Sequence, residues 1–291
     1  MKKPQRLGHE CIFCIIRSFE GLFKTHQLSQ KAKDEISFKF LFNIPEMDLF
    51  RPIPEVTRDI HKLFKEYLNN PDPYKVEKEN NNKFLMGLFS EFQKKVSDSE
   101  NPFETALRLA IAGNIIDYAT NSDFDIMDTI RHVLISDFGI NHSSQLKQEI
   151  EKADTILYLG DNAGEIVLDK LFIKTINHPN VYFAVKGGPI INDVTMEDAI
   201  SVGINEVAKV ISNGYDAPST IIQKSSDEFV DLFNKADLVI SKGQGNLEGL
   251  INNNNKNIFF LLMVKCDLIG RLIGAKKGDF VVKKNNNDKQ I

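Results

Sequence analysis

The sequence contains no tryptophan, three cysteines among 291 residues, and no long apolar run. An odd number of cysteines, in a chain whose first residues lack the apolar core of a signal peptide, argues against structural disulfides. No segment approaches the roughly 18 apolar residues that a membrane-spanning helix needs. The formal net charge of −4 is not the basic excess typical of nucleic-acid binding. We therefore expect a cytoplasmic protein with neither a membrane nor a nucleic acid as its partner.

Several well-known catalytic motifs are also missing from the sequence. It has no G-x-x-x-x-G-K-[ST] loop and no G-x-G-x-x-G turn after its first β-like run, which argues against an NTPase and a nicotinamide-dependent enzyme. Neither G-x-S-x-G nor H-E-x-x-H occurs, which removes the usual signals of a serine hydrolase and a zinc peptidase. Any chemistry must come from side chains that the fold brings together.

The apolar pattern changes near residue 150. Before that point apolar residues recur with helical spacing, as in Val56, Ile60, Leu63 and Phe64. Beyond it, short β-like runs alternate with amphipathic helical segments, which predicts a mainly parallel sheet with helices on both faces. The predicted β-like runs are 156–159, 181–185, 206–211, 238–240, 257–264 and 279–282. We expect a mostly helical region over 1–150, a three-layer α/β domain over 151–284 and a polar tail over 285–291.

The first β-like run ends in an Asp-Asn pair. Ile156 to Leu159 is apolar, Asp161 and Asn162 follow after Gly160, and a helical pattern begins within a few residues. Ligands of open α/β sheets bind at the carboxyl ends of strands, where a helix N-terminus favours anions. Asp161 and Asn162 therefore mark either a site for a hard cation or a phosphate, or an ordinary helix cap.

Polar residues also follow later strands. The second run leads to Asn192 and Asp193, another Asn-Asp pairing, and the last long run leads to Lys265. The turn S-K-G-Q-G-N-L-E follows another run, and its glycines would let main-chain N–H groups approach a phosphate. Its residues of interest are Lys242, Gly243, Gly245 and Asn246. The carboxyl ends of parallel strands share one edge, so we expect these residues to converge.

The residue types at this edge indicate phosphoryl chemistry. The carboxylates of Asp161 and Asp193, with the carboxamide of Asn162, are hard oxygen ligands suited to Mg²⁺ or Mn²⁺ and poor for a closed zinc site. Lys242 and Lys265 would neutralise phosphate oxygens beside such an ion. The alternative for Lys242 is a solvated loop lysine, and the glycines alone would be ordinary turn residues.

At these residues the sequence resembles the DUF89 family of metal-dependent damage-control phosphatases. The resemblance rests on D-N-A-G-E, N-D-V-T, S-K-G-Q-G-N-L-E and F-L-L-M-V-K-C, in that order. C-I-F-C, D-P-Y-K and A-G-N-I-I-D in the first half resemble the branch with an N-terminal C-x-x-C. The similarity extends from about Cys11 to Val282, nearly the whole chain.

The resemblance implies a Rossmann-like α/β domain with a helical N-terminal region packed on it, and a metal-dependent phosphatase of small phosphorylated metabolites. It implies metal ligation by Asp161, Asn162 and Asp193, with Mg²⁺, Mn²⁺, Co²⁺ or Ni²⁺ as the metal. Lys242 would bind the phosphate. Asn114 and Asp117 would line the site from the helical region. The family often has a basic residue before the Asn-Asp pair, where this chain has Ile191, so the substrate range stays open.

Two routes of hydrolysis fit these residues. In one, a metal-bound water attacks phosphorus while Lys242 balances the charge of the phosphoryl group. In the other, Asp161 attacks and forms an aspartyl-phosphate. Asp161 and Lys242 are the predicted catalytic residues in either case. A non-catalytic sensor of phosphorylated metabolites is the alternative function, since it would need the anion site without the metal.

Cys11 and Cys14 form a separate motif. A C-x-x-C pair serves as half of a zinc site, as a redox pair, or as two thiols on one helical turn. The sequence has no second pair of this kind, and Cys266 and scattered histidines would have to complete a tetrahedral site. Packed thiols are the preferred interpretation, because free cysteine is so often buried. The oligomeric state is not indicated by any of these patterns.

Overall fold

The computed structural model describes residues 8–26, 28–43, 51–116 and 126–285. Seven strands of this part of the chain form one sheet, in the order β1-β7-β6-β5-β2-β3-β4. Their bounds are β1 Phe138–Asn141, β2 Ile156–Leu159, β3 Val181–Val185, β4 Lys209–Ser212, β5 Leu238–Lys242, β6 Ile258–Met263 and β7 Phe280–Lys284. All neighbouring strands pair in parallel except β6 and β7, which are antiparallel. The predicted mainly parallel α/β fold is confirmed.

The described helices are α1 His9–Thr25, α2 Gln30–Asn43, α3 Ile53–Leu68, α4 Lys75–Ser97, α5 Pro102–Ile116, α6 Ile126–Ile135, α7 Ser143–Lys152, α8 Glu165–Ile176, α9 Met196–Ser201, α10 Asp227–Lys235, α11 Gly243–Leu250 and α12 Asp267–Ile273. One sheet face packs against α5 and α8, with α4 and α6 outside them, in a single apolar core. Helices α10, α11 and α12 cover the opposite face in a second core. This gives three layers, and strands buried on both faces explain the continuous apolar runs in the sequence.

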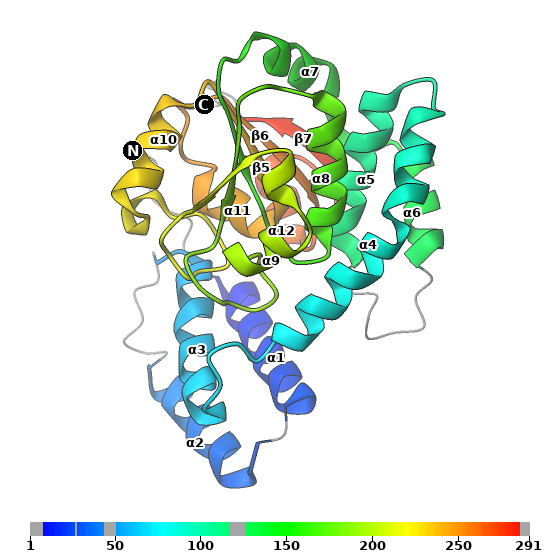
Figure 1. The fold of residues 1–291 in the computed structure, drawn as a ribbon. Coiled ribbons are helices and arrows are strands. Elements are labelled where there is room, and N and C mark those ends of the chain that lie inside the picture. Colours follow the sequence, from blue (N-terminus) through cyan, green and yellow to red (C-terminus); the bar gives the residue numbers. More distant parts are fainter. Residues whose placement is uncertain (1–7, 27, 44–50, 117–125, 286–291) are drawn as a thin grey trace.

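Helices α1, α2 and α3 form a separate helical lobe. They gather at one end of the molecule, and α4 runs from them along the α/β domain (Figure 1). The lobe has an apolar core of its own, to which each of the three helices contributes, for example Ile15, Ile36 and Phe64. The buried side chains of α4, α5 and α6, by contrast, belong to the apolar core that packs against the sheet. The helical region is thus divided between a lobe and a covering layer.

Two predicted boundaries differ from the structure. Strand β1 begins at Phe138, before the predicted boundary at residue 150, and pairs with β7 at the edge of the sheet. The sequence did not predict β1 because this strand has only four residues, which are alternately half-buried and exposed. Asn285, predicted as the start of the tail, is buried and donates its main-chain N–H to Ile258 O. The later positions of the predicted tail lie outside the described residues.

The strand order places a switch point between β2 and β5. From β2 the chain proceeds to β3 and β4 on one side, whereas β5 and β6 lie on the other. In open α/β sheets ligands bind in the crevice at such a point, beyond the carboxyl ends of the strands. Asp161 follows β2 and Gly243 follows β5, so both lie at this crevice. No described helix is long and apolar enough to cross a membrane.

Candidate active site

Two loops at the switch point are joined through their main chains. Asp161 and Asn162 follow β2, and Asn192 and Asp193 follow β3. The N–H of Val194 donates to Asp161 O over 2.8 Å, and the N–H of Ala163 donates to Asn192 O over 2.9 Å. Asn162 and Asp193 thereby form an isolated antiparallel bridge. For these two loops the convergence expected from the parallel sheet is present, and it is held by the backbone.

Gly243 makes room for the Asp161 carboxylate. Its φ is +78°, a conformation that glycine adopts readily, and it is the first residue of α11. A Cβ atom at this position would overlap with the carboxylate of Asp161. The segment after β5, predicted as a glycine-containing turn, is therefore the beginning of a helix, packed directly against the end of β2.

The polar side chains of the two loops are buried. Asp161, Asn162 and Asp193 are 7%, 5% and 3% exposed. The Asn162 carboxamide donates through Nδ2 to Asp161 Oδ2 over 3.0 Å and to Glu165 Oε2 over 3.2 Å. Asp193 Oδ2 accepts no hydrogen bond from the described residues. A buried carboxylate oxygen without a donor is costly, and a cation would satisfy it.

Lys186 is the lysine beside the carboxylates. It follows β3, is 3% exposed, and places Nζ 3.5 Å from Asp193 Oδ2, an ion pair longer than a hydrogen bond. Nζ donates to Asn246 Oδ1 over 3.0 Å. Asn246 is fixed in turn by donating to Gly160 O and Lys242 O. Asn246, predicted to bind phosphate, therefore lies behind Lys186 and orients its ammonium group.

Lys242 has a different place from the predicted one. It is fully buried, and Nζ donates to Glu165 Oε1 and Asp169 Oδ1, each over 2.5 Å, and to Ala110 O over 2.8 Å. Asp169 Oδ1 also accepts from Tyr158 over 2.7 Å. These groups lie on the α5 and α8 side of the sheet and not on the cavity. We therefore correct the prediction that Lys242 contacts phosphate: the structure shows a buried ion-pair network.

Burial and like charges shift the titration of the site carboxyls. Burial, with a smaller contribution from the charge of Asp161, raises the pKa of Asp193 to about 8, although Lys186 opposes this shift. Burial and Glu165 likewise raise the pKa of Asp161. Beneath them, burial raises the pKa of Asp169 to about 7, although Lys242 opposes this shift. The cluster has too few positive charges to keep every carboxyl ionised.

A cavity of about 430 Å³ opens above these loops. Its walls include six predicted site residues, namely Asp161, Asn162, Asn192, Asp193, Gly245 and Lys265. The helical lobe and the start of α4 contribute Ile53, Pro54, Thr57, Tyr74 and Glu77. The cavity is thus bounded by the sheet on one side and by helices of the N-terminal region on the other.

Two further predicted residues come from the helical region. Asn114 belongs to α5, but its side chain lies outside the described residues, as does Asp117. Their predicted part in the site stays a prediction. The neighbouring Gly113 packs against Glu165, so this end of α5 does lie next to the first residue of α8.

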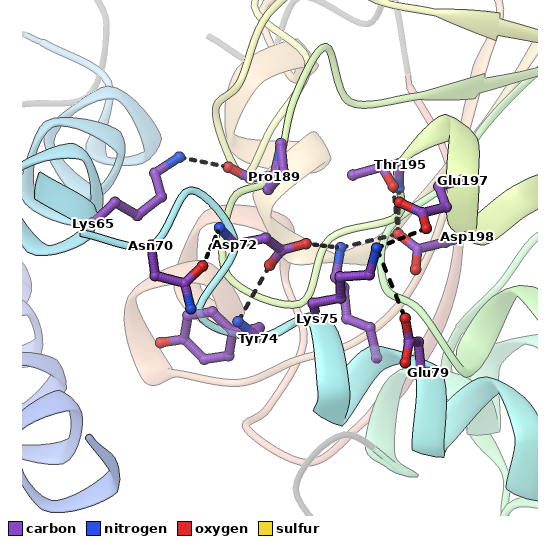
Figure 2. Close-up of polar contacts among 11 residues, drawn as sticks. Lys65, Asn70, Asp72, Tyr74, Lys75, Glu79, Pro189, Thr195, Glu197 and Asp198 are labelled. Carbon is purple, nitrogen blue, oxygen red and sulfur yellow. Dashed lines mark hydrogen bonds and ion pairs between the residues drawn. The ribbon is translucent and has the colours of Figure 1, made fainter. Parts of the chain in front are cut away.

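A buried lysine joins the N-terminal region to the loop that carries Asp193. Lys78 in α4 is 2% exposed, and Nζ lies 2.8 Å from Asp72 Oδ2 and 3.1 Å from Asp198 Oδ2. Asp198 Oδ2 also accepts from the N–H and hydroxyl of Thr195, which closes the end of that loop (Figure 2). Asp72 lies just before α4, and its carboxylate helps to fix the Asp193 loop through Lys78.

Helix α3 holds the other side of the same loop. Lys65 Nζ donates to Pro189 O over 2.8 Å (Figure 2). Arg58, also in α3, pairs with Asp216 over 2.5 Å in the segment after β4. The helical lobe therefore contacts two loops at the carboxyl edge of the sheet, and it helps to set the shape of the cavity.

Cys11, Cys14 and Cys266 line a second cavity of about 500 Å³ beside the first. All three are free thiols. Cys11 is buried in the core of the helical lobe, and burial raises its pKa, whereas Cys14 is exposed. No group of three or more His, Cys, Asp or Glu side chains within the described ranges could hold a metal ion. This arrangement favours the interpretation of Cys11 as a packed thiol.

Some site residues were not singled out from the sequence. Lys186 carries the same signal as Lys242, a lysine directly after an apolar run, and the two could not be ranked by pattern. Glu165 lies in the first turn of α8, where an acidic residue is ordinary. Glu77 and Glu248 lie on helices and carry no local signal of a site, so their place on the cavity wall follows from tertiary structure alone.

The fold and the site together describe an α/β protein whose buried carboxylates and lysine meet at the switch point of its sheet. The chain belongs to the family of the damage-control phosphatase ARMT1-like domain, whose model matches residues 7–281. Membership in this family supports a phosphatase role. The predicted branch with an N-terminal C-x-x-C stays a prediction, because the match identifies the family as a whole.

Similar proteins agree with this assignment. A damage-control phosphatase from Pyrococcus horikoshii is 38% identical over 236 residues, covering 77% of this chain and 78% of that protein. An uncharacterized protein from Methanocaldococcus jannaschii is 36% identical over an alignment of 298 residues, covering 96% and 95%. The crystal structure of a DUF89 family protein from Pyrococcus horikoshii superposes with a TM-score of 0.88 at 29% identity, covering 97% of this chain and 100% of that one.

Proposed function

We propose that this protein is a divalent-metal-dependent phosphatase that hydrolyses phosphate monoesters of small metabolites. The observation that carries the proposal is the pairing of the Asp161 and Asp193 loops on the wall of a cavity of about 430 Å³. The buried Lys186 lies beside Asp193. A phosphate group needs positive charge on its oxygens, and two carboxylates can present that charge when they hold a metal ion.

The charges of the buried cluster support a divalent ion. Four buried carboxyl groups face two buried lysines, so full ionisation would leave an excess of two negative charges that a divalent ion would neutralise: Asp161, Glu165, Asp169 and Asp193 against Lys186 and Lys242. The orphaned Oδ2 of Asp193 is an available ligand. A half-turn of the Asn162 carboxamide would present its oxygen as a further ligand of the ion. Since no third carboxylate, histidine or cysteine of the described chain joins this group, water and phosphate oxygens would complete the shell.

The chain's own residues have distinct parts in the reaction. Asp161, Asn162 and Asp193 would hold the ion, which when bound supplies Lewis acidity and a lowered pKa of water. Lys186 is placed to bind a phosphate oxygen beside Asp193, and Lys265 adds positive charge on the cavity wall. Asp161 is required whether water attacks phosphorus or its carboxylate does so. The loops need no rearrangement, because their main-chain bonds fix them.

The test is phosphate release from p-nitrophenyl phosphate after treatment with a chelator, with Mg²⁺, Mn²⁺, Co²⁺ or Ni²⁺ then added singly. We expect release to require a metal, and Asp161→Asn and Asp193→Asn each to lower it by about a hundredfold or more. Calorimetric titration with the metal alone should show weakened binding in both variants. Asp98→Asn, which changes an exposed carboxylate at the end of α4, is the matched control.

Near-normal turnover by either aspartate variant, with its fold intact by circular dichroism, would reject the assignment. Absence of metal-dependent release together with tight binding of a phosphorylated metabolite would favour the alternative of a non-catalytic sensor. Metal binding that is lost in Asp161→Asn but not in Asp98→Asn would support the ligand set independently of activity.

A further inference from the structure

The cavity has two glutamates on its wall in addition to the paired aspartates. Glu77 comes from the first turn of α4 and Glu248 from α11. Within the described residues neither of them joins Asp161 and Asp193 in a group that could hold a metal ion. They therefore border the space that the part of a substrate other than its phosphate would occupy.

The position of Glu77 follows from the packing of α4. Asn81, four residues later and on the same face of the helix, contacts Gly164, and Asn82 Oδ1 accepts from the N–H of Gly164 over 2.6 Å. Glu77 lies one helical turn, about 5.4 Å, before this contact. The carboxylate therefore stands next to the turn that carries Asp161 and Asn162, on the helical side of the cavity.

Glu77 has no partner within the described residues that would neutralise it. No described residue forms a hydrogen bond or ion pair with its carboxylate, although the side chain is half-buried and burial raises its pKa. The exposed Glu79, two residues further along α4, pairs with Lys75 at 3.9 Å. A half-buried acceptor that faces a cavity is available for donors of a bound molecule.

Within the described residues Glu248 forms one side-chain hydrogen bond, with the neutral Gln244, and the charge of Lys265 also acts on it. Gln244 Nε2 donates to its Oε1 over 3.1 Å, and Gln244 Oε1 accepts from the N–H of Lys265 over 3.0 Å. Burial raises the pKa of Glu248 to about 7, while Gln244 and Lys265 oppose the shift. Around neutral pH this second carboxyl thus carries a substantial negative charge on the wall of the same cavity.

We infer that Glu77 and Glu248 select substrates by charge. The cavity accepts a phosphate monoester whose remaining part is uncharged or cationic and carries hydroxyl or amino donors, and it rejects one that bears a second anionic group. The inference rests on the proposed phosphatase function. Its physical basis is that like charges repel strongly where water is excluded, whereas donors pair with the two carboxylates.

The test uses two substrates that differ in one end group. Glycerol 3-phosphate and 3-phosphoglycerate have the same phosphate and the same chain length, but the second carries a carboxylate. We expect kcat/KM of the wild-type protein to favour glycerol 3-phosphate by about tenfold or more, the ratio that about 1.4 kcal/mol of repulsion produces. Glu77→Gln and Glu248→Gln should each reduce this ratio through improved use of 3-phosphoglycerate, and Glu77→Asp should retain it.

Glu79→Gln is the control, because it removes the same charge from the same helix at an exposed site that does not line the cavity. If Glu77→Gln and Glu79→Gln had the same ratio of kcat/KM for glycerol 3-phosphate over 3-phosphoglycerate, the inference would be overturned. A wild-type preference for 3-phosphoglycerate would also overturn it. Equal loss of kcat on both substrates in Glu77→Gln would also overturn it and assign Glu77 to the chemical step. Wild-type protein that releases no phosphate from p-nitrophenyl phosphate with any metal would reject the proposed function, and this inference with it.

Discussion

The ammonium group of Lys186 lies 3.5 Å from Oδ2 of Asp193, a buried oxygen that accepts no hydrogen bond within the described part of the chain. Lys242, by contrast, forms buried ion pairs with Glu165 and Asp169, which both belong to α8. The two lysines therefore belong to different clusters: Lys186 lies beside the paired aspartates and is proposed to bind phosphate, whereas Lys242 joins a buried ion-pair network.

We predict that Lys186→Met lowers metal-dependent phosphate release by about a hundredfold, the usual cost of losing one group that stabilises transition-state charge. The fold should persist, because Asn246 keeps its bonds to Gly160 and Lys242. The measurement is steady-state kinetics with p-nitrophenyl phosphate beside a thermal unfolding curve. Lys174→Met, at an exposed lysine of α8, is the control. Unchanged kcat/KM in Lys186→Met would contradict the proposed contact with phosphate.

Lys242→Met is expected to destabilise the protein by roughly 3–5 kcal/mol, since it leaves two buried carboxylates without their cation. Denaturant-induced unfolding measures this loss. Replacing Glu165 by Gln in the same variant should recover part of it, because one of the uncompensated charges is then removed. A Lys242→Met protein as stable as the wild type, but with a raised KM for the phosphate ester, would restore the original prediction that Lys242 binds phosphate.

Gly243→Ala should abolish most of the phosphate release, because the added methyl group takes the space of the Asp161 carboxylate. Gly274→Ala is a matched control: φ is +80°, close to the +78° of Gly243, and nothing lies within 4 Å of the added carbon. Both variants carry similar backbone strain, about 1–2 kcal/mol. Activity that falls equally in the two would attribute the effect to strain and not to Asp161.

The buried His61 in the helical lobe is expected to make the stability of the protein sensitive to acid. Burial, with smaller effects of Lys65 and His26, lowers the pKa of His61 to about 4, so the folded protein keeps the ring neutral. The unfolded chain takes up the proton near pH 6.5, so stability decreases from about pH 6.5 down to about pH 4, by up to about 3 kcal/mol. Urea unfolding of His61→Gln should be less dependent on pH in this window.

The exposed His132 provides the control, since His132→Gln should retain the pH dependence of the wild type. A His61→Gln protein that loses stability as steeply as the wild type between pH 6.5 and pH 4 would show that other groups cause the acid sensitivity.

Much of the α/β fold followed from the sequence because its strands are buried on both faces. The bounds predicted for β2 and β3 agree with the structure, and α8 follows Asn162 within a few residues, as its helical pattern predicted. The edge strand β1 was missed because its apolar content is small and its partner comes from the far end of the chain. Pairing of distant edge strands has no local signal, whereas burial of central strands does.

The sequence predicted that the two aspartates of the site lie together, but it did not predict the position of Lys242. Parallel strands bring Asp161 and Asp193 to one edge, and the structure places them together, while their role as metal ligands stays a prediction. Lys242 was predicted to lie in a turn and to bind phosphate, because β5 was predicted to end at Ile240. In fact Lys242 is the last residue of β5, so it shares the face of Leu238 and Ile240, which pack toward α5 and α8.

The pairing of β1 with β7 has a consequence for how this chain matures. Of the seven described strands, β1 is synthesised first, yet its one neighbour in the sheet is synthesised last. On the ribosome β1 has no strand partner until β7 has emerged. Removal of β7 would leave β1 without a partner and expose β6 as a new edge, which ties the integrity of the α/β domain to this one strand.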